Sequence, residues 1–168
     1  ERIQYEIKRL VEGDWADDVI PLLKRIGLLS NWCNKSKVFI SQPNYLKGAK
    51  SFESNELTMA LPLVRLVHLL SDKGLQDLRF SKKDIQICQA LRKWQDKNDG
   101  VAFRSLKESE LFKLHLELED HLPALILDIP VDQQKKWLLR WRNTSDPLFH
   151  PSPPLDGFTI QEVLGVKE

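Results

Sequence analysis

The chain has 168 residues, of which 42% are hydrophobic and 29% charged, which suits one compact domain or one domain with a small appendage. Its formal net charge of +1 does not point to nucleic acid, so any basic surface must come from segregation of charge. Cys33 and Cys88 are too few for a disulfide framework or a zinc site and are expected to be free thiols. No run of about 18 apolar residues could span a bilayer and no secretion leader is present, so we expect a cytoplasmic protein without a membrane partner.

The first 29 residues predict two short helices joined by a tight turn, an αα-hairpin. Gly13 interrupts the first helix, and Asp18 is expected to cap the second, with Pro21 in its first turn. Gly27 then provides a left-handed stop. The apolar side chains of the first helix recur at helical spacing: Ile3, Ile7, Leu10 and Val11.

The most apolar stretch of the chain follows a polar connection at residues 31–54. Leu57–Leu70 is apolar on almost every side, which is typical of a core helix. Pro62 should kink this helix or lie in its first turn. Arg65 and His68 share one face, and we expect them to form its solvent-facing edge rather than a functional pair.

A long helix is predicted from a capping box at Ser81–Asp84 to about Asn98. Its buried stripe is expected to contain Ile85, Cys88, Leu91 and Trp94. Another side of this helix carries three lysines and no acid. It could equally be an ordinary solvated face or a surface that faces RNA. That polar stripe consists of Lys82, Gln86, Gln89, Lys93 and Lys97, with Lys83 and Arg92 beside it.

Ser105 and Glu108 form another capping box, which predicts a helix through about Glu119. The alternation in the second half of this segment would also fit a strand, but no other strand is available to pair with it. Glu117 and His121 have the spacing of two metal ligands on one helix face. Two ligands are too few to predict a metal site.

The most basic decapeptide lies near the end of the chain. Leu122–Leu127 is expected to be helical, and Asp132 to cap a helix at Gln133–Arg142. Interleaved cations and tryptophans are typical of phosphate contacts combined with base stacking, although core tryptophans under a basic exterior would give the same pattern. The residues concerned are Lys135, Lys136, Trp137, Arg140, Trp141 and Arg142.

These segments predict an all-α fold, an irregular array of about seven to nine short helices with αα-hairpins and no significant sheet. The expected organisation is a helical hairpin at residues 1–30, a helical body at 31–146, and a proline-rich linker with the start of a tail helix at 147–168.

Both ends of the chain resemble bacterial tRNA nucleotidyltransferases (CCA-adding enzymes) and their poly(A) polymerase relatives. The order and spacing of the hairpin residues resemble the neck signature of this family: Glu1, Arg2, Ile3, Glu6, Leu10, Gly27, Leu28 and Leu29. The residues near the C-terminus resemble the start of its tail: Pro154, Leu155, Gly157, Ile160 and Gly165. The middle of the chain matches only in its helical pattern.

The catalytic residues of that family are not found in this sequence. Nucleotide transfer needs carboxylates that hold Mg²⁺, which the family supplies as Asp-x-Asp after a glycine-containing phosphate-binding turn. The chain contains no Asp-x-Asp and no glycine-rich loop, so no catalytic residue, metal ligand or cofactor is assigned. Because the chain begins at Glu1 in mid-pattern, we expect a fragment whose parent carries an N-terminal catalytic head that uses Mg²⁺ and CTP or ATP.

The resemblance therefore implies an RNA-binding helical region that positions the tRNA acceptor arm, or another RNA 3′ end, for nucleotide addition by that head. The region alone is expected to be inactive. An alternative is a helical protein–protein interaction domain without an RNA role; only RNA binding should weaken steeply with salt. The RNA contacts are expected among Lys82, Lys83, Arg92, Lys93, Lys97, Lys135, Lys136, Arg140 and Arg142.

Overall fold

The computed structural model describes residues 2–33, 49–98, 106–150 and 161, and these residues confirm the predicted all-α fold. They contain no strand, only an isolated antiparallel bridge between Cys33 and Leu70. The α-helices are α1 (Arg2–Glu12), α2 (Ala16–Arg25), α4 (Ser54–Leu69), α5 (Asp72–Asp77), α6 (Lys82–Asn98), α7 (Glu108–Leu118), α8 (Leu122–Asp128) and α9 (Val131–Arg142). Two 3₁₀ turns are η1 (Ala49–Ser51) and η2 (Glu119–His121).

Helices α1 and α2 form the predicted hairpin, with Ile7 and Val11 buried against the body. Ile3, predicted on the same face, remains 48% exposed. The prediction that Asp18 caps α2 is wrong, because α2 begins at Ala16 and Asp18 lies in its first turn. An acid there still interacts favourably with the positive end of the helix dipole. Pro21 lies beyond that first turn, inside the helix.

Gly27 ends α2 as predicted, with a φ of +71°. Its N–H donates to the carbonyl of Lys24 at 3.1 Å, and the N–H of Leu28 donates to the carbonyl of Leu23 at 3.3 Å. This pair of bonds is a Schellman motif, which satisfies the last carbonyls of a helix and favours glycine at the left-handed position.

Helix α4 is the central helix and packs against both α8 and α1. Val64, Val67 and Leu69 are fully buried, which confirms its predicted place in the core. Pro62 lies in the interior of the helix rather than in its first turn. Met59 is 45% exposed, so one side of α4 faces solvent.

The expectation that Arg65 and His68 form a solvent-facing edge is wrong. Arg65 is 6% exposed and binds Asp17 of the hairpin. The Nε2 atom of His68 lies 2.8 Å from a carboxylate oxygen of Asp128 in α8, and that carboxylate also accepts a hydrogen bond from Gln95. Both side chains find partners on other helices, which a helical pattern alone cannot reveal.

The remaining boundaries agree with the predictions to within a few residues. The hydroxyl of Ser81 accepts the N–H of Asp84 at 3.0 Å, which confirms the cap of α6. Helix α7 confirms helix over strand, but its cap is formed when the carboxylate of Glu110 accepts the N–H of Lys107 at 3.1 Å. Helix α9 begins at Val131, before the predicted cap Asp132.

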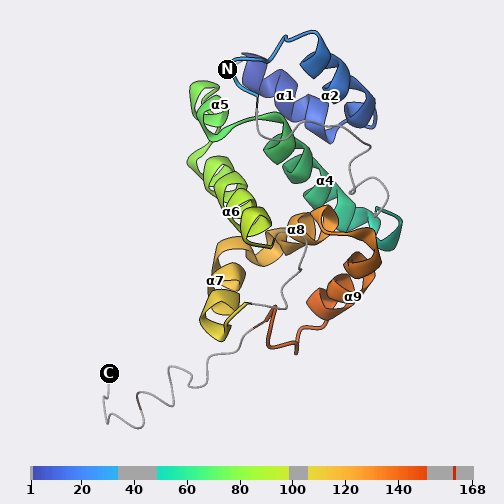
Figure 1. The fold of residues 1–168 in the computed structure, drawn as a ribbon, viewed down its shortest axis with the longest axis vertical. Coiled ribbons are helices and arrows are strands. Elements are labelled where there is room, and N and C mark those ends of the chain that lie inside the picture. The colour runs from blue at the N-terminus through green and yellow to red at the C-terminus, as the bar shows by residue number, and fades with distance from the viewer. Residues whose placement is uncertain (1, 34–48, 99–105, 151–160, 162–168) are drawn as a thin grey trace.

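Figure 1 shows the hairpin at one end of the molecule, with α7 and α9 at the other and α4, α6 and α8 between them. Helices α6 and α9 lie on either side of α8, and both contact it. Several predicted features lie outside the described residues: Glu1, Ser105, Pro154, Leu155, Gly157, Ile160, Gly165 and most of the connection at residues 31–54.

Candidate RNA-contacting surface

Lys93 and Lys97 of the predicted stripe are paired with acids of α7. The ammonium of Lys93 lies 2.7 Å from a carboxylate oxygen of Glu117, and that of Lys97 lies 2.8 Å from Glu110. Both ammonium groups also lie over the ring of Trp94, at 5.3 and 5.0 Å from its centroid. These lysines therefore hold α6 against α7, and only part of their charge is available to a ligand.

Arg92 has a structural position in the body. Its guanidinium binds the carboxylate of Asp72 and donates to the carbonyl of Leu70, which ends α4. The side chain thus joins α6 to the junction of α4 and α5, where few of its donors face solvent.

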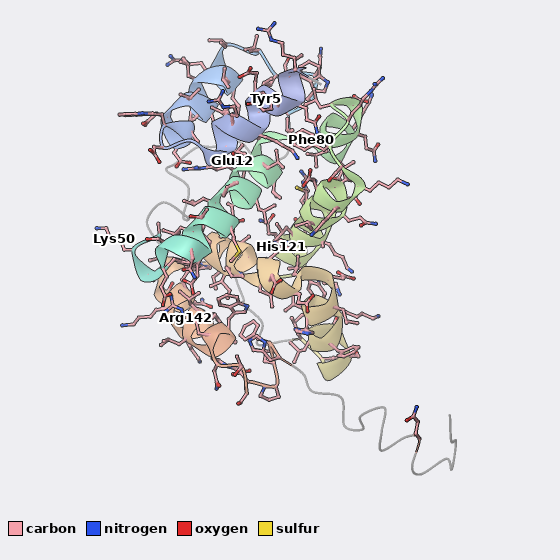
Figure 2. All side chains as sticks on the ribbon, turned by 180° about the vertical axis from the view of Figure 1, so that it is seen from behind. Tyr5, Glu12, Lys50, Phe80, His121 and Arg142 are labelled. Carbon is pink, nitrogen blue, oxygen red and sulfur yellow. The ribbon has the colours of Figure 1, made fainter. Side chains whose placement is uncertain are left out.

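Two of the four predicted cations on α9 are also paired. Arg140 donates to both carboxylate oxygens of Asp146, at 2.7 and 3.0 Å. Arg142, labelled in Figure 2, does the same to Glu56 of α4, at 2.7 and 2.6 Å. Burial alone would raise the pKa of Glu56, but the hydrogen bonds from Arg142 and from the N–H of Glu53 outweigh it and lower that pKa.

Four of the predicted cations remain exposed without an ion pair to any described residue: Lys82, Lys83, Lys135 and Lys136. The ammonium of Lys136 lies 5.6 Å from the ring centroid of Trp137, a buried tryptophan that fills the core under α9. Trp137 is therefore not a stacking platform, whereas Trp141 is half-buried.

Lys73 of α5 and Arg79, which were not predicted as RNA contacts, precede Lys82 and Lys83 in the chain and are also exposed. The sequence feature that could have identified them is the high density of cations from α5 to the start of α6. We call Lys73, Arg79, Lys82 and Lys83 the α5–α6 basic surface, and Lys135 with Lys136 the α9 basic surface. Figure 1 shows α6 on one side of α8 and α9 on the other, so the two surfaces belong to different helices of the body.

The hairpin presents a different kind of surface. Arg2, Ile3 and Glu6, which carry much of the family resemblance, are all exposed on α1. One face of α2 is apolar, with exposed Trp15, Leu22 and Ile26 and half-buried Val19 at helical spacing, followed by exposed Leu28. Contiguous apolar side chains at the surface are typical of a protein–protein contact.

No cluster of three potential metal ligands occurs within the described ranges, and Glu117 has other partners there. Glu117 is engaged by Lys93 and by the indole N–H of Trp94. Burial lowers the pKa of His121, and the nearby charge of Lys83 lowers it further. The charge of Lys83 therefore acts on His121, the residue that precedes α8.

Comparison with known protein families, with curated proteins and with solved structures gave no match. Among the described helices, none has the length and apolar character needed to cross a membrane. The function must therefore be argued from the residues and their geometry.

Proposed function

We propose that this chain is the RNA-binding helical region of a tRNA nucleotidyltransferase or poly(A) polymerase. It would hold the acceptor arm of tRNA, or another RNA 3′ end, for nucleotide addition by a catalytic head that is not part of this chain. The family resemblance of the hairpin supports this proposal, as does the all-α fold that the resemblance implies.

The observation that carries the proposal is the presence, on both basic surfaces, of exposed cations that form no ion pair with another described residue. Proteins recognise an A-form helix mainly through its phosphates, 2′-hydroxyls and shape, because its major groove is too narrow to read. Lysines distributed over a broad helical surface suit such contacts. Lys82 and Lys83 would contact one stretch of backbone, and Lys135 and Lys136 another.

The hairpin would connect this platform to the catalytic head. Exposed Arg2, Ile3 and Glu6 and the apolar face of α2 are not needed for packing against the body. In this proposal the head covers the apolar face of α2 and buries Trp15 and Ile26, which are exposed in this chain. The same face favours the alternative, a protein–protein interaction domain without an RNA role, which RNA-binding experiments distinguish.

The proposal is tested by measuring tRNA affinity for the isolated chain over a range of salt concentrations. We expect the logarithm of the binding constant to fall linearly with the logarithm of the salt concentration. The slope should become shallower by about one for each phosphate contact removed. The double variants Lys82→Glu/Lys83→Glu and Lys135→Glu/Lys136→Glu should each bind tRNA at least about tenfold more weakly. A matched control, Arg9→Glu/Arg25→Glu, changes the charge equally on the hairpin and should retain affinity.

Two results would overturn the proposal. One is the absence of tRNA binding even at low ionic strength, which would favour the protein–protein alternative. The other is an equal loss of affinity in the control and in the two test variants, which would show non-specific attraction. With Mg²⁺, CTP or ATP and tRNA, the chain alone should add no nucleotide.

A further inference from the structure

A groove of about 480 Å³ opens between the end of α1 and one side of α4. Figure 2 labels Glu12 at this end of α1, beside α4. Met59 contributes to the wall and is 45% exposed, so an apolar surface is available there. The lining residues are Glu12, Asp14, Leu57, Thr58, Met59, Leu61, Pro62 and Arg65.

The groove carries negative charge that the described residues do not neutralise. Glu12 and Asp14 are exposed, and neither has an ion pair in the described part of the chain. Lys8, one helical turn before Glu12, is bound instead to Asp84 at 2.8 Å.

The cation in the lining does not compensate for these acids. The guanidinium of Arg65 is used by the carboxylate of Asp17 and by the carbonyls of Val11 and Gly13. Two carboxylates therefore lie beside an apolar wall, and no described residue supplies them with a positive partner.

We propose that this groove binds a basic segment of a partner protein. A lysine or arginine side chain would place its charged end between Glu12 and Asp14, and its methylene groups would lie over Met59 and Pro62. A purely apolar segment would desolvate two carboxylates without pairing them. RNA phosphates would be repelled by the same carboxylates, so this contact is separate from the basic surfaces.

The test uses a fluorescein-labelled octapeptide of alternating arginine and leucine, with an alternating glutamate and leucine peptide as its control. We expect the full chain to bind the basic peptide with a dissociation constant of about 10–100 μM and the acidic peptide not measurably. The variant Glu12→Gln/Asp14→Asn should bind the basic peptide about tenfold more weakly, since it loses two charge pairs. Fluorescence anisotropy measures each affinity.

The control variant Asp77→Asn/Asp96→Asn removes the same charge from exposed acids outside the groove and should bind as the wild type does. Met59→Ala should weaken binding about threefold, because a groove-bound side chain loses apolar contact while simple charge attraction does not. All these positions are exposed, and circular dichroism verifies that each variant folds. Unchanged binding in Glu12→Gln/Asp14→Asn, or an equal loss in the control, would overturn the proposal. Binding of tRNA should be unaffected, so the two proposals fail independently.

Discussion

Arg65 on α4 binds the carboxylate of Asp17 on α2 and so fixes the hairpin to the body. Its Nε donates to Asp17 at 3.1 Å, and its Nη1 donates to the carbonyl of Val11 at 2.7 Å and to that of Gly13 at 3.2 Å. One guanidinium thus donates hydrogen bonds to acceptors at the end of α1, in the turn and at the start of α2. The orientation of the hairpin, and of anything attached to it, depends on this side chain.

We predict that Arg65→Ala destabilises the fold by about 3–5 kcal/mol, because it removes a buried donor from the half-buried carboxylate of Asp17 and from two carbonyls. Urea unfolding followed by circular dichroism measures the change. As the control, Lys8→Ala removes a partly exposed ion pair with Asp84 and should cost less than about 1 kcal/mol. Similar losses in the two variants would contradict the role assigned to Arg65.

Gly74 and Gly27 are constrained in different ways, and replacing each with alanine should lower the stability of the fold by different amounts. A Cβ at Gly74 would lie 2.2 Å from the carbonyl oxygen of Trp32, whose backbone is held by a hydrogen bond from Ser71 at 2.8 Å. A Cβ at Gly27 would meet open space, and only its positive φ is unfavourable. We expect Gly74→Ala to lower the unfolding free energy by more than about 2 kcal/mol, and Gly27→Ala by about 1 kcal/mol. Thermal melts of both variants test this order, and the reverse order would contradict it.

The pair formed by Glu56 and Arg142 should make stability depend on acid pH. The pKa of Glu56 in the folded protein is lowered from its ordinary value of 4.5, so folding stabilises the ionised form. This contribution is present above pH 4.5 and is lost as the pH falls through the lowered native pKa. We expect Glu56→Gln to cost about 1–3 kcal/mol at pH 7 and to flatten the acid limb of the stability curve. An unchanged acid limb in urea titrations at several pH values would disprove this linkage.

The two thiols should differ in reactivity. Cys88 is fully buried, and burial raises its pKa to about 12. Cys33 is only partly buried, and burial raises its pKa as well. Because the thiolate is the nucleophile, we expect a disulfide reagent at pH 8 to modify Cys33 slowly and Cys88 only after unfolding. The variants Cys33→Ser and Cys88→Ala show which thiol accounts for each kinetic phase of the labelling reaction. Rapid labelling of Cys88 in the native protein would refute the prediction.

The sequence predicted features that depend on local patterns. The hydroxyl of Ser81 and the positive φ of Gly27 act within a few residues, and the buried stripe of α6 follows from helical spacing alone. Partners across the fold could not be predicted in this way, because no local pattern relates Lys93 to Glu117 or His68 to Asp128. For the same reason the predicted RNA contacts include ion-paired cations, such as Lys93 and Lys97, together with unpaired ones.

This difference between paired and unpaired cations gives a final prediction about RNA binding. Lys93 and Lys97 already neutralise Glu117 and Glu110, so replacing them removes little positive potential from the surface once their partners are also neutralised. The quadruple variant Lys93→Gln/Lys97→Gln/Glu110→Gln/Glu117→Gln keeps the net charge of the chain and should retain tRNA affinity to within about threefold. Lys135→Gln/Lys136→Gln should instead lose affinity and reduce the salt slope by about two. Filter binding at several salt concentrations compares the two variants. A larger loss in the quadruple variant, with its helix content intact, would show that the ion-paired lysines of α6 contact the RNA.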